Sequence, residues 1–204
     1  MKLVFATGNK GKLAEARSIL GEGFEIISPD TLGITEDIPE TGSTLKENSL
    51  LKAEYIWKKT GLNCFADDTG LEVDALNGEP GIYSARYAGQ GHDFDANVNK
   101  LLRNLSGIPA PRKARFRCVV TLILNGEIHC FEGTMPGSIA MEKAGKGGFG
   151  YDPVFIADEY PDRTVAELPD GLKNKISHRG NSLRVMAEWI RENFGTPGEQ
   201  DTYR

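Results

Sequence analysis

The dipeptide Asn125-Gly126, which separates two apolar segments at residues 116–124 and 127–133, constrains the fold of this chain more than any other feature. Asn-Gly is the strongest short signal for a two-residue β-hairpin, because both residues tolerate the positive φ angles that such a turn requires. The two flanking segments are therefore expected to be adjacent antiparallel strands.

Four further segments carry apolar residues at the three- and four-residue spacing of an amphipathic helix. The first segment begins after Gly11 and ends at Leu20, and the other three occupy about 44–59, 93–105 and 181–194. Thr44 and Glu47 form a possible capping box, and the helix at 93–105 is expected to bury a stripe that includes Phe94 and Val98. Strands are expected at residues 2–6, 24–27, 62–66, 71–75 and 151–156. Strands that alternate with helices, together with a hairpin, predict an α/β protein with a mixed sheet.

Length and composition limit the class of protein. The 204 residues suit one domain with an ample core, in which residues 195–204 form a loose tail. The net charge of −5 argues against a general nucleic-acid surface, which is usually strongly basic. The chain has no run of about 18 apolar residues, so no membrane span is expected, and its apolar start is too short for a signal peptide. Three scattered cysteines, Cys64, Cys118 and Cys130, favour buried thiols in a reducing cytoplasm over disulfides or a zinc site.

The segment Thr7-Gly8-Asn9-Lys10-Gly11-Lys12 follows the first strand and precedes a helix. Backbone N–H groups at a helix start, with two lysines, suit an anion such as a phosphate. The segment lacks the pattern GxxxxGK[ST], so it is not the common P-loop. A plain strand–helix turn with solvated lysines is the alternative.

Two adjacent acids, Asp67 and Asp68, end the apolar run at 62–66, and strand ends are where ligands bind in α/β sheets. Neighbouring residues of a strand point to opposite faces, so one carboxylate can face a site while the other braces the loop. Carboxylates suit Mg²⁺, and Glu40 is a candidate second ligand. The alternative is a turn in which the aspartates accept backbone hydrogen bonds and Glu40 is solvated.

Two more segments follow the hairpin. Residues 145–153 contain GxGxxG, but Pro153 and an apolar run follow it instead of a helix, which excludes the dinucleotide-binding fold. Aromatic residues in this loop could hold a base by stacking or could belong to the core. Residues 173–180 place lysine, histidine and arginine donors before the last helix, which suits an anion or a carbonyl oxygen. No Ser/His/Asp pattern indicates covalent catalysis.

Taken together, these segments resemble the inosine triphosphate pyrophosphatase family, whose members degrade non-standard purine nucleotides. The matching strings are TGNKGK at 7–12, ETGSTLKEN at 40–48, FADDTGLEVDAL at 65–76, PGIYSARYAG at 80–89, GGFGYDPVF at 147–155 and KNKISHRG at 173–180. Several unusual strings in a fixed order, spanning nearly the whole chain, are far more specific than any one of them.

The resemblance implies an elongated α/β fold, in which a mixed, curved central sheet is flanked by helices and two lobes enclose an active-site cleft. It also implies a homodimer. The residues implied to cradle the triphosphate are Thr7, Gly8, Asn9, Lys10, Gly11 and Lys12, and those implied to hold Mg²⁺ are Glu40 and Asp68. The other implied substrate contacts are Thr69, Phe149, Gly150, Tyr151, Asp152, Lys173, His178 and Arg179. In this assignment Phe149 stacks on the base, Lys173 contacts phosphate or sugar, His178 and Arg179 read the purine edge, and Thr69 replaces a frequent serine.

The implied reaction converts a nucleoside triphosphate and water into a monophosphate and pyrophosphate, with Asp68 as general base, and would clear ITP, dITP and XTP from the nucleotide pool. Arg179 donors would pair with the 6-oxygen of these bases, whereas adenine presents another donor there. Two alternatives remain open. One is a Maf-like pyrophosphatase with a different base preference, and the other is a nucleotide sensor without catalysis.

Overall fold

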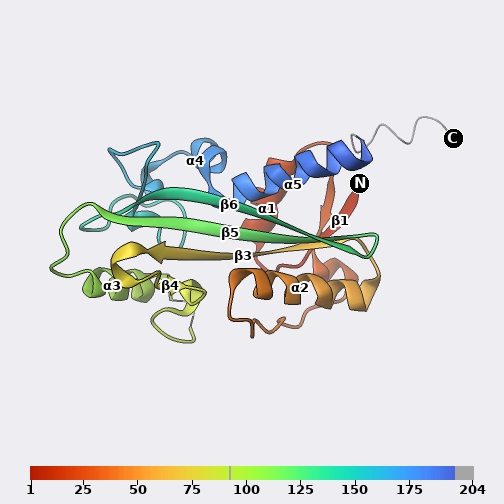
Figure 1. The fold of residues 1–204 in the computed structure, drawn as a ribbon, viewed down its shortest axis with the longest axis horizontal. Helices are drawn as coiled ribbons and strands as arrows, with labels where there is room; N and C mark the ends of the chain where they lie inside the picture. Colours follow the sequence, from red (N-terminus) through yellow and green to blue (C-terminus); the bar gives the residue numbers. More distant parts are fainter. Residues whose placement is uncertain (92, 196–204) are drawn as a thin grey trace. The chain divides into compact units, whose positions relative to one another are not determined.

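The computed structural model describes residues 1–91 and 93–195 (Figure 1). Its helices are α1 (Lys10–Leu20), α2 (Leu45–Thr60), α3 (Phe94–Asn104), α4 (Asp170–Ile176) and α5 (His178–Phe194). Its strands are β1 (Lys2–Phe5), β2 (Glu25–Ile27), β3 (Cys64–Val73), β4 (Pro80–Gly81), β5 (Arg112–Leu124), β6 (Glu127–Ile139) and β7 (Phe155–Ala157). Within these described residues, no helix is long and apolar enough to cross a membrane.

The strands form a mixed seven-stranded sheet in the order β2-β1-β3-β5-β6-β7, with β4 paired to β3. β1 is parallel to both β2 and β3, whereas β4 is antiparallel to β3 and β7 is antiparallel to β6. The prediction of an α/β fold with a mixed sheet is confirmed.

The chain forms two compact units. Among the described residues, unit 1 comprises Met1–Asp68, Cys118–Gly133 and 179–195, and unit 2 comprises Thr69–Arg117 and Thr134–His178. The single domain expected over residues 1–204 stays a prediction. Of the loose tail expected at 195–204, only Gly195 lies within the described residues.

In unit 1 the side chains of β1 and of the following residue, Ala6, alternate between two apolar clusters. Leu3 and Phe5 pack with the buried residues of α1 and α5, whereas Val4 and Ala6 pack with those of α2. Helices α1 and α5 therefore cover one face of the strands in this unit, and α2 covers the other (Figure 1). The alternation is the period of two expected of a strand that is buried on both faces.

In unit 2 helix α3 buries Val98 and Leu101 in a cluster that includes Leu71 of β3 and Phe116 of β5. The expectation that Phe94 belongs to this buried stripe is wrong, because its side chain is 44% exposed. Phe94 is the first residue of α3 and lies outside the apolar cluster onto which the following turns pack.

The hairpin at Asn125-Gly126 is confirmed, since both residues have positive φ angles, 52° and 86°, between β5 and β6. The two strands expected at 62–66 and 71–75 are instead one continuous strand, β3. Gly70 permits this continuity, because a Cβ at that position would lie only 2.6 Å from the carbonyl oxygen of Gly81 in the paired strand β4. Asp67 and Asp68 consequently lie inside a strand and not at its end.

Three smaller expectations need correction. The strand expected at 151–156 is a short 3-10 turn, Asp152–Val154, followed by β7. The last helix begins at His178, so the donor-rich segment at 173–180 is mostly helical. Cys130 is exposed, whereas Cys64 and Cys118 are buried as expected.

Candidate functional site

The candidate phosphate loop leads into α1 in unit 1. Asn9 caps the helix, because its Oδ1 accepts hydrogen bonds from the backbone N–H groups of Gly11 at 2.8 Å and Lys12 at 3.1 Å. The Thr7 hydroxyl accepts another from the Asn9 N–H at 3.1 Å. Gly8 and Lys10 are exposed. The loop is therefore a well-capped helix start that presents one exposed lysine.

The neighbouring acids of β3 serve different faces of the strand, as the alternation of side chains requires. Asp67 lies on the face covered by α1 and α5 and is 1% exposed. It accepts Lys12 Nζ at 3.0 Å on Oδ1 and Arg179 Nε at 2.8 Å on Oδ2. Arg179, in the first turn of α5, also donates to Glu15 of α1. Asp67 thus connects both covering helices through ion pairs.

Asp68 lies on the face covered by α2 and is 8% exposed. Asn48 Nδ2 of that helix donates to Asp68 Oδ2 at 3.1 Å. Lys52, one helical turn later, places its Nζ 3.5 Å from Asp68 Oδ1 and 2.5 Å from Glu40 Oε1. The two carboxylates predicted as metal ligands are therefore brought together, and a buried ammonium lies between them.

The adjacent carboxyl groups have opposite pKa shifts. Burial would raise the pKa of Asp67, but the charges of Lys12 and Arg179 outweigh it and hold that pKa well below its usual range. Burial raises the pKa of Asp68, and the attraction of Lys52 opposes this only in part because Glu40 repels the charged form. Burial also acts to lower the pKa of Lys52, yet the surrounding carboxylates raise it. Asp67 is thus an ion-pair anchor, and Asp68 is the more basic of the two.

Sequence reasoning missed Asn48 and Lys52, although a signal was present. The buried residues of α2 recur at helical spacing. They are Leu45, Asn48, Ser49, Lys52, Ala53 and Ile56. A lysine and an asparagine within an apolar stripe indicate buried polar partners, since such groups are rarely buried unless they are paired.

In unit 2 the loop around Phe149 is organised by Asp152, which is 6% exposed. Its Oδ2 accepts the Phe149 N–H at 2.9 Å and the Lys173 ammonium at 2.6 Å. The same ammonium lies 4.6 Å from the centroid of the Phe149 ring. A Cβ on Gly148, whose φ is +73°, would lie 2.1 Å from Asp152 Oδ2, so this position requires glycine. Asp152 and Lys173 together hold Phe149 with its ring 44% exposed.

The remaining predicted contacts of unit 2 are Thr69, Gly150, Tyr151 and His178. The Thr69 hydroxyl is buried and has no hydrogen-bond partner among the described residues. Gly150 has a φ of +63°. The Tyr151 hydroxyl donates to the Ser84 carbonyl at 2.8 Å, and its ring belongs to the core. The His178 ring stacks on Phe116, with centroids 4.8 Å apart and planes 12° apart.

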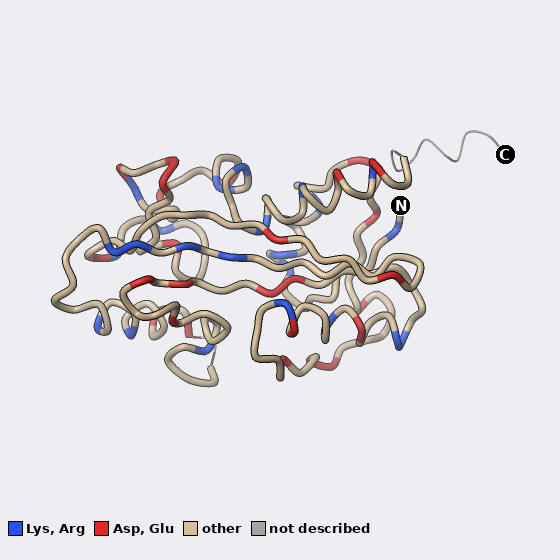
Figure 2. Tube along the Cα trace, viewed as in Figure 1, with Lys and Arg blue, Asp and Glu red and all other residues tan. Residues whose placement is uncertain are grey.

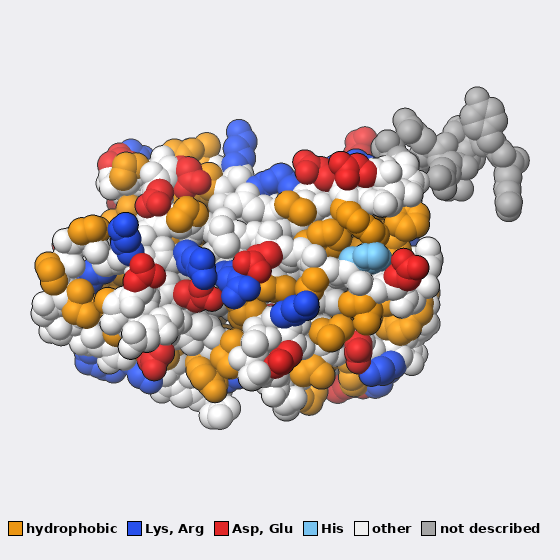
Figure 3. Space-filling model, in the orientation of Figure 1, with side chains coloured by type: hydrophobic (Ala, Val, Ile, Leu, Met, Phe, Trp, Pro, Cys, Tyr) orange, Lys and Arg blue, Asp and Glu red, His pale blue; other side chains and the backbone are white. Residues whose placement is uncertain are grey.

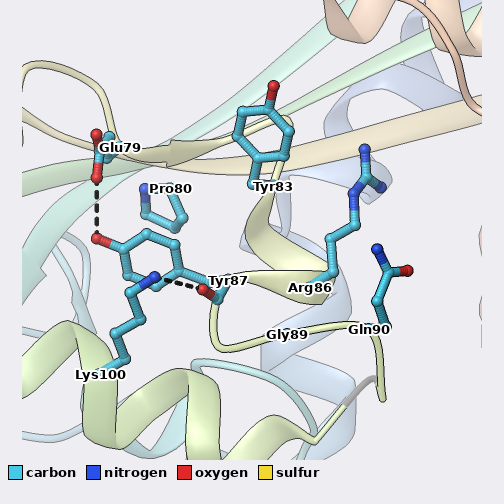
Figure 4. A pocket seen from close by; sticks show the side chains of 8 residues that line it. All are labelled: Glu79, Pro80, Tyr83, Arg86, Tyr87, Gly89, Gln90 and Lys100. Carbon is cyan, nitrogen blue, oxygen red and sulfur yellow. Dashed lines mark hydrogen bonds between the residues drawn. The ribbon is translucent and has the colours of Figure 1, made fainter.

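The string at 80–89 forms a turn that braces strand β3. Ser84 Oγ accepts the Leu71 N–H at 2.8 Å and donates to the Gly81 carbonyl at 2.6 Å. A cavity of about 420 Å³ adjoins this turn (Figure 4), and its lining residues are Glu79, Pro80, Tyr83, Arg86, Tyr87, Gly89, Gln90 and Lys100. Lys100 donates to the Tyr87 carbonyl at 2.6 Å, and the Tyr87 hydroxyl donates to Glu79 at 3.1 Å. The bracing contacts give the turn a structural role.

Charged side chains elsewhere in unit 2 largely pair with one another. Basic residues follow closely along the first half of β5 (Figure 2), and two of them, Arg115 and Arg117, bind Glu72 at 2.7 and 3.5 Å. The Glu72 carboxylate therefore forms ion pairs with two arginines. On the face drawn in Figure 3, Lys and Arg side chains lie among Asp and Glu side chains. This mixture agrees with the charge of −5, and the absence of a nucleic-acid partner stays a prediction.

Comparison with known protein families shows to which family the chain belongs. The model of the Ham1 family matches residues 3–189, which include every residue of the candidate site. The chain belongs to the Ham1 family. Two solved Ham1 proteins share its fold. The Staphylococcus aureus protein aligns with a TM-score of 0.85 at 41% identity, and the Coxiella burnetii protein with 0.86 at 39%. Each alignment covers 94% of this chain and 99% of the other.

Two curated relatives of this Ham1 chain carry the same name. The dITP/XTP pyrophosphatase of Porphyromonas gingivalis is 52% identical over 189 residues, which are 93% of this chain and 97% of the relative. The dITP/XTP pyrophosphatase of Flavobacterium johnsoniae is 50% identical over 190 residues, which are 93% and 98% of the two chains. The resemblance expected from the sequence is confirmed, and the Maf-like alternative is set aside because the matching family is Ham1.

Proposed function

We propose that this chain hydrolyses ITP, dITP and XTP to the monophosphate and pyrophosphate, and so clears non-standard purine nucleotides from the nucleotide pool. The names of its close relatives support this substrate class, and those relatives align over nearly their whole length. The chain also carries, in order, the strings on which the family resemblance rests. The observation that carries the proposal is the grouping of Glu40, Lys52 and Asp68.

The grouping suits a divalent metal, and Glu40 with Asp68 would hold Mg²⁺. Both carboxylates approach the same nitrogen within 3.5 Å, so a small movement of Lys52 would let them share a cation. Mg²⁺ usually takes one or two carboxylates and completes its shell with waters and substrate phosphates. The described residues contain no group of three or more His, Cys, Asp or Glu that could form an all-protein site. When bound, Mg²⁺ neutralises charge on the phosphates.

The chain supplies the rest of the chemistry. Asp68 accepts a proton from the water that attacks the α-phosphorus, while the bond between that phosphorus and the leaving pyrophosphate oxygen breaks. Asn48 fixes the carboxylate by donating to Oδ2. Lys10, exposed at the start of α1, attracts the phosphates, and Lys12, which also pairs with Asp67, adds a second positive charge there.

The residues of unit 2 are proposed to bind the base. Phe149 offers an exposed ring for stacking, and Lys173, whose ammonium lies over that ring, would contact sugar or phosphate. Thr69 contributes a hydroxyl that lacks a partner within the described chain. His178 of unit 2 and Arg179 of unit 1 are proposed to read the purine edge, and Arg179 also forms ion pairs with Asp67 and Glu15. The homodimer and the cytoplasmic location also stay proposals.

A product assay tests the function directly. The purified chain is incubated with Mg²⁺ and ITP, XTP, GTP, ATP, CTP or UTP, and the products are separated by ion exchange. We expect inosine monophosphate and pyrophosphate from ITP, slow turnover of ATP and GTP, and loss of activity with a chelator that Mg²⁺ restores. Formation of IDP and phosphate would contradict the cleavage position. Binding without turnover would favour the sensor alternative.

A further inference from the structure

Phe94 is an exposed aromatic residue that the core does not use. The helical stripe of α3 would bury it, yet its side chain is 44% exposed, as is that of Phe149. The centroids of the two rings lie 6.3 Å apart and their planes are tilted by 49°. Offset and tilted pairs at such distances are favourable contacts between aromatic rings. Two exposed rings in contact form a small apolar surface that water does not favour.

The first turn of α3 is fixed in place. Asp93 caps the helix by accepting the Ala96 N–H at 2.9 Å, which holds Phe94 at the first helical position. Asp95 forms an ion pair with Lys143, a residue of the segment that leads into the Phe149 loop. The loop is therefore attached to α3 both by an ion pair and by the contact between the two rings.

The surroundings of Phe149 then divide into a polar and an apolar side. The ammonium of Lys173 lies 4.6 Å from the ring centroid and is held by Asp152. The Phe94 ring is the aromatic neighbour. A flat, largely apolar group that stacks on Phe149 would also come within reach of the Phe94 ring, which is tilted by 49° from that of Phe149. Charged phosphates would instead favour the ammonium.

We infer that Phe94 contacts the purine base beside Phe149 and sets the position of that ring. This inference rests on the proposed function, because it assigns the base of the same substrate to this surface. Phe94 acts on the base alone. It has no part in holding the phosphates or in the chemical step.

The test compares Phe94→Ala, Phe94→Leu and Phe94→Tyr with the unmodified chain. Removal of a ring that contacts a base weakens binding, and we expect Phe94→Ala to raise KM for ITP about fivefold, with kcat within about twofold. Phe94→Leu should resemble Phe94→Ala because it lacks a ring face, and Phe94→Tyr should restore KM. Ile128→Ala, which removes an apolar side chain that is 52% exposed in unit 1, is the matched control and should leave KM unchanged.

Inhibition by tripolyphosphate separates a base contact from a general structural effect. This probe carries the phosphate chain without a base, so its inhibition constant should be the same in Phe94→Ala and the unmodified chain. An unchanged KM in Phe94→Ala would overturn the inference, and so would a parallel rise in the inhibition constant.

If the unmodified chain releases no monophosphate from ITP, that result contradicts the proposed function independently of the inference about Phe94. Calorimetric titration with inosine monophosphate still tests Phe94 in that case. Weaker binding to Phe94→Ala than to Phe94→Tyr would uphold the base contact, and equal binding or no binding would overturn it.

Discussion

The Lys52 ammonium lies 2.5 Å from Glu40 Oε1 and 3.5 Å from Asp68 Oδ1, so one buried positive charge holds together the two carboxylates of the proposed metal site. Without this charge, two carboxylates at close range would repel one another, and one of them would take up a proton. Lys52 is therefore expected to keep both groups ionised before the metal and the substrate bind.

Replacing Lys52 tests this arrangement. We expect Lys52→Met to lower kcat/KM for ITP by about 100-fold, because a preorganised charge at the site is lost. Steady-state kinetics at several Mg²⁺ concentrations would measure the effect. Lys58→Ala on the same helix removes an exposed lysine that pairs with Glu54, and it should have no effect. Equal kinetics for both variants would contradict the role of Lys52.

Asp68→Asn should separate activity from stability. The amide cannot accept the proton of the attacking water, so kcat should fall by at least about 100-fold. Because folding raises the pKa of Asp68, the ionised carboxylate costs free energy at neutral pH that a neutral amide does not. Urea unfolding at pH 7 should therefore show an unchanged or higher free energy of unfolding. Near-normal turnover would remove Asp68 from the proposed chemistry.

The neighbouring change, Asp67→Asn, should behave in the opposite way. Asp67 is buried against Lys12 and Arg179, and its removal leaves buried positive charge without its main partner. Breaking one side of such a buried pair costs about 3–5 kcal/mol. We expect a loss of that size in urea unfolding. A loss below about 1 kcal/mol would show that these ion pairs do not hold α1 and α5 to the strand.

Arg179→Ala distinguishes reading of the base from ion pairing. A donor that pairs with the 6-oxygen should, when removed, lower kcat/KM for ITP much more than for ATP. A donor that only satisfies Asp67 and Glu15 would affect both substrates equally. The ratio of the two kcat/KM values is the measurement, and an unchanged ratio would exclude Arg179 from base recognition.

The three thiols should differ in reactivity with a maleimide. Burial raises the pKa of the Cys64 thiol to about 12, so its reactive thiolate is scarce at pH 8 and grows only above about pH 11. Cys118 is also buried, whereas Cys130 is exposed. We expect one fast modification in the folded protein, and Cys130→Ser should abolish it. Mass spectrometry would assign the site, and fast labelling of Cys64 would contradict its burial.

Local sequence signals predicted much of the fold, including the Asn125-Gly126 hairpin and the capped start of α1 at Asn9. They failed where distant partners decide the outcome. Gly70 appeared to interrupt a strand, yet it admits the close approach of β4. Phe94 had the spacing of a core residue, but its neighbour is an exposed ring from a segment more than 50 residues away.

The candidate site was predicted in the same uneven way. Glu40 and Asp68 could be found because acids near glycine loops suggest metal ligands. Lys52 was missed because a lysine within a helix is usually solvated, and only the buried stripe around it indicates otherwise. The opposite environments of Asp67 and Asp68 follow from which helix covers which face of β3, and no local pattern encodes that.

Asp67 and Asp68 occupy successive positions of one strand, and this limits which sequence changes the protein can accept during evolution. Inserting or deleting a single residue between Phe65 and Asp67 would send each carboxylate to the opposite face. An insertion would put Asp67 in the place beside Lys52, and a deletion would put Asp68 in the place beside Arg179. Loops of this protein can tolerate changes of length, but this stretch of β3 can accept substitutions only.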